Sequence, residues 1–166
     1  MASLDKARDY PEEQLWEEVD RVRAGMLGVE GSCQHMQPMA PNPDPDGQCL
    51  WFFAKTDSDI VRSISVGARA HFTIVGKNHD YHACMSGPIK VIKDPERIER
   101  YWSSVVETWF EGGKTDPTLT MLRISLEDAA IWVSTDNPLA FGWEIAKANL
   151  KDRTPDAGVR TRVRFR

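Results

Sequence analysis

Short apolar segments separated by close turns constrain the fold of this chain more than any other feature. The segments fall at residues 26–29, 35–39, 49–53, 70–75, 81–86, 89–92, 121–124 and 129–133. The first two are expected to pair as a hairpin, and turn-forming residues separate the others at 42–47, 76–80 and 126–128. Helices do not alternate regularly with the strands, as they do in β-α-β folds. Antiparallel pairing of the strands is therefore favoured over parallel pairing. The sequence therefore predicts a mainly β fold, a closed or nearly closed antiparallel barrel with flanking α-helices.

Four helices are expected around this barrel. The first covers 11–23, where a proline and two acidic residues precede apolar residues at helical spacing. The second begins at Asp57 or Ser58 and ends at Gly67. The third starts with an Asp-Pro pair at 94–95 and carries a broad apolar face until the glycine pair at 112–113. A short fourth helix is expected at 142–150.

The composition indicates one globular domain. A chain of 166 residues can bury one core but is short for two ordinary domains. Hydrophobic residues make up 41% and charged residues 28%, and no uninterrupted apolar run is long enough to span a bilayer. The first twenty residues are rich in Asp and Glu and have no apolar segment of the signal-peptide kind. We therefore expect a cytoplasmic protein without a membrane partner.

The residues that most often carry chemistry form no recognisable motif. Cys33, Cys49 and Cys84 include no C-x-x-C pair, so neither a disulfide framework nor a zinc site is expected. His79 and His82, three apart on a predicted strand, would point to opposite faces, and no metal site is predicted. His35 and His71 are expected to be strand residues with local partners. No catalytic residue is predicted, and any chemistry would come from a cofactor.

The C-terminal residues 159–166 alternate strictly between Val, Thr or Phe and Arg. As a strand they would present four arginines on one face, which suits an edge strand with a charged outer side. We expect a split-barrel domain with an N-terminal helix over 1–155, and a basic C-terminal tail or edge strand over 156–166. Two sharper hypotheses remain open, namely arginines that bind a ligand phosphate and a weak nucleic-acid contact, although a nucleic-acid partner is not favoured.

The stretch 50–58, Leu-Trp-Phe-Phe-Ala-Lys-Thr-Asp-Ser, is the strongest candidate for a ligand site. An aromatic strand that leads into a helix start can hold a flat ring against a wall and an anion near backbone amides. A core strand buried on both faces would read the same way. The spacing to Pro38-Met39 and to Asp57-Ser58 favours the ligand site, and Trp109-Phe110-Glu111-Gly112-Gly113 follows much later in the chain.

These segments, in this order, resemble the general stress protein branch of the pyridoxamine 5'-phosphate oxidase-like, FMN-binding split barrels. The resemblance covers about residues 14–155. It implies an antiparallel split barrel that binds FMN in a cleft between two protomers, hence a homodimer, and an FMN-dependent oxidoreductase of unknown substrate. It assigns the cofactor to ten residues, with Trp109 reaching the site of the other chain: Gln37, Pro38, Met39, Phe52, Phe53, Ala54, Lys55, Asp57, Ser58 and Trp109.

The chain departs from the family at the residues that bind the phosphate. Gln37 replaces an Arg, Ala54 replaces a Thr or Ser, and Ile60 replaces a Lys. Loss of two charged hydrogen bonds would remove about 3–6 kcal/mol, roughly two to four decades of affinity. Lys55, Arg62, Ser63 and the backbone amides at the start of the Asp57 helix could compensate. Two alternatives to a flavoenzyme therefore stay open. One is a flavin-less dimeric stress or interaction protein, and the other is a split barrel that binds FAD, a deazaflavin or haem.

Overall fold

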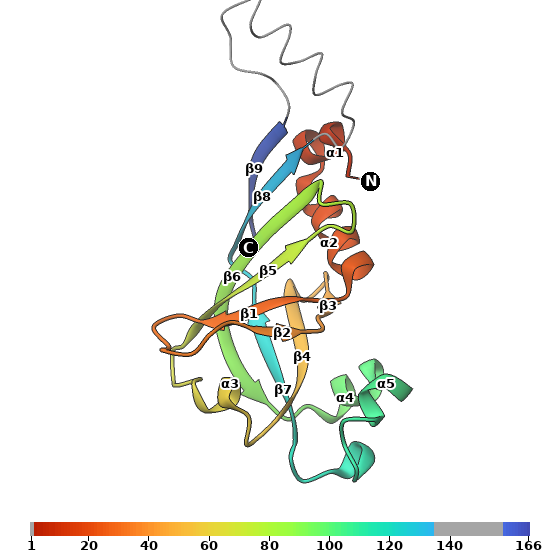
Figure 1. Ribbon diagram of the computed structural model, residues 1–166, viewed down its shortest axis with the longest axis vertical. Coiled ribbons are helices and arrows are strands. Elements are labelled where there is room, and N and C mark those ends of the chain that lie inside the picture. Colours follow the sequence, from red (N-terminus) through yellow and green to blue (C-terminus); the bar gives the residue numbers. More distant parts are fainter. Residues whose placement is uncertain (1, 135–157) are drawn as a thin grey trace, which may run out of the picture.

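The computed structural model describes residues 2–134 and 158–166, which form strands and short helices (Figure 1). The predicted helix at 142–150 lies outside the described residues. The strands are β1 (Gly25–Val29), β2 (Gln37–Met39), β3 (Asn42–Asp44), β4 (Cys49–Lys55), β5 (Arg69–Val75), β6 (Tyr81–Ile92), β7 (Leu119–Ser125), β8 (Asp128–Ser134) and β9 (Gly158–Arg164). The helices are α1 (Leu4–Asp9), α2 (Pro11–Val22), α3 (Asp59–Arg62), α4 (Pro95–Tyr101), α5 (Ser104–Glu107) and the 3₁₀ turn η1 (Gly113–Thr115).

All the strand pairs are antiparallel, in the order β2-β1-β5-β6-β7-β4-β3, with β8 paired to β6 and β9 paired to β8. Long strand β6 connects the two parts of the sheet, since residues 81–86 pair with β8 and residues 89–92 pair with β7. The change of partner occurs at Gly87, where a Cβ atom would lie only 1.8 Å from the Ser125 carbonyl oxygen. Only glycine permits this close approach. The result is the predicted mainly antiparallel β half-barrel with helices.

The main core lies on the inner face of the half-barrel. Phe52 of β4 meets Phe72 of β5 edge to face, with ring centroids 5.0 Å apart and both side chains fully buried. Helices α1 and α2 run beside the sheet (Figure 1) and bury Ala7, Leu15 and Val19 in the same core. Full burial of one Leu or Phe side chain contributes about 1.5–3 kcal/mol, so these contacts hold the helices to the sheet.

The alternate residues of β4 form a second cluster on the opposite face. Cys49, Trp51 and Phe53 pack toward α4, α5 and the residues after them, where Ile98 and Phe110 are buried. Strand β4 is thus covered on both faces, which explains its uninterrupted apolar sequence. The core-strand interpretation of this segment is therefore correct, whatever else its edges do.

Two expected helices are shorter than the sequence suggested. The apolar segment at 94–111 forms α4 and α5 rather than one helix, because Trp102 is extended (ψ 136°) and packs between Phe53 and Phe110. Ser103 then starts α5, its hydroxyl accepting a hydrogen bond from Val106 N. The second expected helix is the single turn α3, and Gly67 adopts positive φ in a later turn.

One loop also contains a strand. Residues 42–44 of the predicted turn segment form β3, where the Asn42 amide donates to the Trp51 carbonyl. None of the helices in the described part of the chain combines the length and the apolar character that a bilayer crossing requires.

Candidate functional site

The fold brings the first two predicted ligand motifs close together. Strand β2 leads into β3 after residues 40–41, and β3 pairs with β4 so that Asn42 lies opposite Trp51. Met39 is three residues before Asn42, within about 11 Å of it along the chain. Residues 37–39 join β3 at its Asn42 end, opposite Trp51, and Met39 packs against the main core that contains Phe52 and Ala54 of β4.

Strand β2 is an edge strand. Its only pairing within the described residues is with β1, through Gly25, Met26 and Leu27. The other edge of β2 therefore presents backbone groups that can bind a polar ring edge. Gln37 and Met39 are half-buried and Pro38 is exposed.

The aromatic residues of β4 are not equivalent. The Phe52 ring is fully buried, so its side chain has no surface for a ligand in this protomer. Ala54 is 7% exposed, whereas Phe53 is half-buried with its ring edge-on to Trp102 at 6.0 Å. Only Phe53 and the backbone of this strand therefore remain as candidates for contact with a flat ring.

The segment after β4 offers less for an anion than the sequence suggested. Ser58 donates its hydroxyl hydrogen bond to the Lys55 carbonyl, 2.7 Å away, and does not cap α3. Helix α3 has four residues, too few for an appreciable helix dipole. Arg62 bonds the Asp57 carbonyl and the Asp59 carboxylate.

Two further residues define the charge at this end. Lys55 is exposed, with its ammonium 5.9 Å from the centroid of the Phe110 ring. Ile60 is 4% exposed and belongs to the main core, so its side chain does not face solvent here. Of the cations that this chain has near the end of β4, Lys55 is thus the one best placed to contact a bound anion.

Trp109 is exposed, at 68%, although its neighbour Phe110 is buried. It follows α5, and its backbone amide bonds the Val106 carbonyl at 3.0 Å. Val105 on α5 is 70% exposed. An apolar surface of this kind is typical of contact with another molecule.

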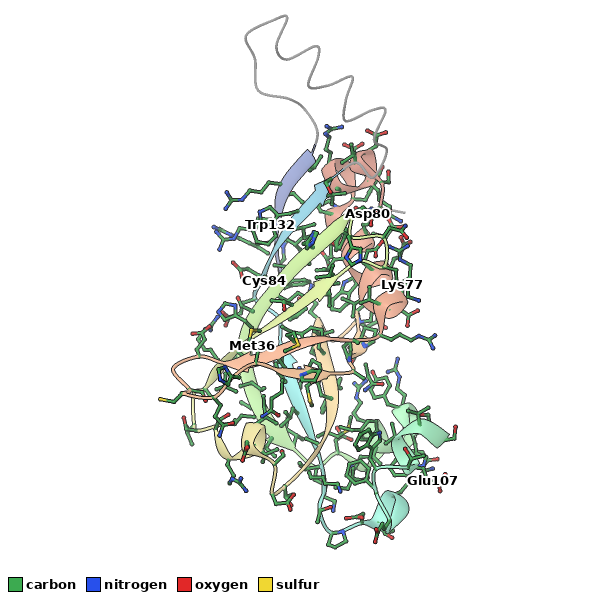
Figure 2. All side chains as sticks on the ribbon, viewed as in Figure 1. Met36, Lys77, Asp80, Cys84, Glu107 and Trp132 are labelled. Carbon is green, nitrogen blue, oxygen red and sulfur yellow. The ribbon has the colours of Figure 1, made fainter. Side chains whose placement is uncertain are left out.

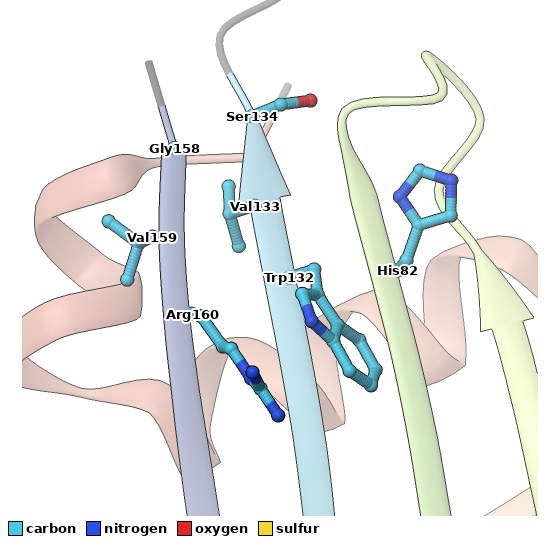
Figure 3. Close-up of a pocket in the computed structure, with 7 residues that line it drawn as sticks. All are labelled: His82, Trp132, Val133, Ser134, Gly158, Val159 and Arg160. Atoms are coloured by element: carbon cyan, nitrogen blue, oxygen red, sulfur yellow. The ribbon is translucent and has the colours of Figure 1, made fainter. Parts of the chain in front are cut away.

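Two pockets among the described residues lie elsewhere. One of about 230 Å³ is lined by His82, Trp132 and Arg160 among others (Figure 3), with the Arg160 guanidinium 5.9 Å from the Trp132 ring. A second, of about 550 Å³, lies between the α1–α2 junction and β9. Neither contains a predicted flavin residue. Two arginines of β9 have partners within the same sheet: Arg160 lies over the Trp132 ring and Arg162 bonds Asp128.

A polar cluster on the outer face of β5 and β6 was missed by sequence reasoning. His71 does have local partners, as expected for a strand histidine: Nδ1 is 3.5 Å from Cys84 Sγ, and Nε2 is 3.0 Å from Glu30 Oε1. Burial raises the pKa of the Cys84 thiol, and the negative charge of Asp128 raises it further. The register of the β5–β6 hairpin, had it been fixed from the sequence, would have revealed this contact.

Comparison with known proteins identifies the family. A family model described as pyridoxamine 5'-phosphate oxidase like matches residues 11–156. The chain belongs to this family. No curated protein matches it significantly.

Several solved structures are similar to this chain. A protein of the general stress protein 26 type from Jannaschia sp. CCS1 is 32% identical, with a TM-score of 0.73, and the match covers 90% of this chain and 95% of that one. A general stress FMN/FAD binding protein from Xanthomonas citri is 34% identical, with a TM-score of 0.66, over 74% and 87% of the two chains. A general stress family protein from Xanthomonas campestris pv. campestris is 30% identical, with a TM-score of 0.68, over 81% and 92%. The predicted resemblance to the general stress branch is thus confirmed.

Proposed function

We propose that this chain binds FMN, in a cleft completed by a second copy of itself, and acts as a cytoplasmic flavin-dependent oxidoreductase of the general stress type. The observation that carries the proposal is the 34% identity to a general stress FMN/FAD binding protein. The local geometry supports it, because Met39 of free edge β2 packs against the main core that contains Phe52 and Ala54 of β4.

The residues present fit a flavin whose ring is held better than its phosphate. The free backbone edge at Gln37 to Met39 suits the hydrogen-bonding side of the ring, and the half-buried Phe53 suits its apolar side. For the phosphate, Lys55 supplies an exposed ammonium, whereas Arg62 is engaged by Asp57 and Asp59. We therefore infer that phosphate binding contributes less here than in relatives with the full cation set.

A bound flavin would supply the redox chemistry, and the protein would bind, orient and shield the ring. In the proposed dimer, Trp109 of one protomer covers the site of the other, excluding water from the ring face. No side chain of the described residues is assigned as acid or base. Which substrates can react therefore depends on which molecules fit against the flavin ring face that Trp109 covers.

The absorption spectrum of the freshly purified protein, followed by titration with FMN, riboflavin and FAD, tests the proposal. We expect flavin absorption bands, or quenching of flavin fluorescence on titration. We also expect the affinity for FMN to exceed that for riboflavin, but by less than two to four decades, which is what two further charged contacts would add. The absence of both bands and quenching would contradict the proposal and favour the flavin-less protein. Haem or deazaflavin bands would favour the other alternative.

The role of Trp109 is tested by Trp109→Ala, with Val105→Ala as the control for a neighbouring exposed apolar residue. We expect the tryptophan variant to weaken flavin binding about tenfold or more, since a ring contact contributes roughly 1.5 kcal/mol beyond its buried area. Equal affinities in both variants and the unaltered protein would show that Trp109 does not cover the ring.

A further inference from the structure

Three side chains from neighbouring strands form a connected row on the outer face of the sheet. Cys84 lies on β6, His71 on β5, and Glu30 directly after β1, its amide bonded to the Arg69 carbonyl. In the β5–β6 register, Thr73 is opposite Cys84 and Ser86 is opposite His71. His71 and Cys84 are therefore diagonal neighbours on one face, close enough for side-chain contact. Figure 2 shows Cys84 on this sheet, between the levels of Trp132 and Met36.

The distances place the imidazole between a thiol and a carboxylate. Nδ1 of His71 is 3.5 Å from Cys84 Sγ, and Nε2 is 3.0 Å from Glu30 Oε1. A carboxylate only accepts hydrogen bonds, so the contact with Glu30 favours the tautomer with its proton on Nε2. In that tautomer Nδ1 carries a lone pair directed at the thiol, which is the arrangement needed to remove its proton.

A metal site does not explain this row. The two ring nitrogens point away from each other, so the thiol and the carboxylate contact opposite sides of the imidazole. Among residues 2–134 and 158–166, no group of three His, Cys, Asp or Glu side chains is placed to hold a metal ion.

The residues of this row are partly exposed. Cys84 is half-buried, and its register partner on β8 is Ala130, which has a short side chain. The His71 and Glu30 side chains are 46% and 40% exposed. Cys49, in contrast, is buried, and Cys33 is exposed in the loop after β1.

We propose that Cys84, His71 and Glu30 form a reactive thiol site that takes a hydroperoxide as its oxidant. His71 Nδ1 removes the thiol proton as the sulfur attacks one peroxide oxygen. The S–O bond forms while the O–O bond breaks, so the sulfur loses two electrons and becomes a sulfenic acid. The leaving oxygen takes the proton from His71 and departs as water or an alcohol.

The electrostatics explain why a base is needed. Burial and the Asp128 carboxylate raise the pKa of the Cys84 thiol, so the thiolate is not already formed at neutral pH. Other charged groups around the row are Arg69, whose Nε is 3.7 Å from Glu30 and which also binds Glu127, and Arg162, which binds Asp128. These arginines are held by carboxylates, which leaves His71 as the group in contact with the sulfur. Glu30 acts as a positioning residue.

The first test measures sulfenic acid formation in the full-length protein. Hydrogen peroxide is added with dimedone, which traps sulfenic acids, and peptide mass spectrometry compares Cys84 with Cys33 in the same molecule. We expect Cys84 to react at least tenfold faster than Cys33 at pH 7, and His71→Asn to remove that advantage. The control is His82→Asn, which changes an exposed histidine on β6, the strand that contains Cys84. This variant should leave the Cys84 rate unchanged. Equal rates at Cys84 and Cys33, or a rate unaffected by His71→Asn, would overturn the proposal.

The second test separates a base from a merely structural contact through the pH profile of iodoacetamide alkylation. We expect the unaltered protein to react at Cys84 at lower pH than His71→Asn does, because the imidazole accepts the thiol proton. In His71→Asn the rate should rise only as the thiol itself ionises, and burial raises the pKa of that thiol above its ordinary value. Glu30→Gln should shift the profile in the same direction by a smaller amount.

Superimposable profiles would exclude His71 as the base, and a shifted profile without trapped sulfenic acid would exclude a hydroperoxide as the oxidant. Both outcomes are independent of flavin binding, so the proposed function can fail without this site failing.

Discussion

At the residue scale, the two positions at which the resemblance expects phosphate ligands, Gln37 and Ile60, have different surroundings. Ile60 is 4% exposed in the main core, so Ile60→Lys would bury an ammonium rather than present it to a phosphate. We expect this variant to lower the free energy of unfolding by about 2–4 kcal/mol without strengthening FMN binding. Chemical denaturation measures the loss, and Val66→Lys, at a fully exposed position, is the control. A stable lysine variant with tighter FMN binding would show that Ile60 faces the ligand after all.

Gln37 can be restored more safely. It is half-buried on free edge β2, so an arginine there can extend into solvent or toward a ligand. We expect Gln37→Arg to strengthen FMN binding about tenfold relative to riboflavin, because one charged hydrogen bond contributes about 1.5–3 kcal/mol. The control is Gln34→Arg, which adds the same charge in the exposed loop before β2. The same gain in both variants would indicate a general charge effect.

At the scale of the elements, Asp128 links three strands. Its Oδ1 accepts a hydrogen bond from the Ser86 hydroxyl of β6 at 2.7 Å, and its Oδ2 accepts from Arg162 of β9 at 2.6 Å. The Ser86 contact, and then the Arg162 contact, lower the pKa of the carboxyl. A lowered pKa in the folded state means that the carboxylate stabilises the fold above its unfolded pKa, and that this stabilisation is lost as pH falls through the folded value.

We therefore expect Asp128→Asn to lower the free energy of unfolding by about 1 kcal/mol at pH 7, and by less below about pH 4. Arg162 is 65% exposed, so most of the effect comes from the serine contact. Thermal unfolding at pH 7 and pH 3 measures the difference. Arg160→Gln, which removes an arginine of β9 that contacts Trp132 instead, is the control. A difference that stays constant across this pH range would mean that the ionised state of Asp128 contributes nothing to stability.

Helices and strands were predictable where the sequence has a regular local pattern of apolar residues. They were less predictable where tertiary packing determines the backbone conformation. The continuous apolar run at 49–53 and the alternation over 70–75 and 159–165 predicted strands that the structure contains, since both patterns are local properties of the sequence. The break at Trp102 was not predictable, because it depends on the Phe53 and Phe110 rings, which come from distant parts of the sequence. The Cys84–His71 contact was missed for the same reason, since it requires the exact hairpin register.

The same limit applies to the candidate site. The sequence order of 37–39 and 50–58 predicted that these segments approach, and β3 provides the connection. The sequence did not reveal that Phe52 faces the core whereas Phe53 lies on the opposite face of β4. That difference depends on which face of β4 meets β5 and which meets α4.

At the scale of the whole molecule, the proposed flavin site is incomplete without a second copy. Val105 and Trp109 expose 70% and 68% of their surface beside the second core cluster, and a lone protomer would leave them in water. C2 dimers are the commonest closed assembly, and in a two-fold dimer each exposed tryptophan can reach the partner's site.

We expect multi-angle light scattering to give about twice the chain mass of 18.8 kDa, with or without flavin. Replacing both exposed side chains, as Val105→Ser with Trp109→Ser, should shift the mass toward the monomer on dilution, because the buried apolar area would fall. Val66→Ser removes a still more exposed apolar residue from another loop and should not change the mass. A monomer mass for the unaltered protein would exclude the shared cleft, and any flavin binding would then have to be explained by β2, β4 and Lys55 of a single chain.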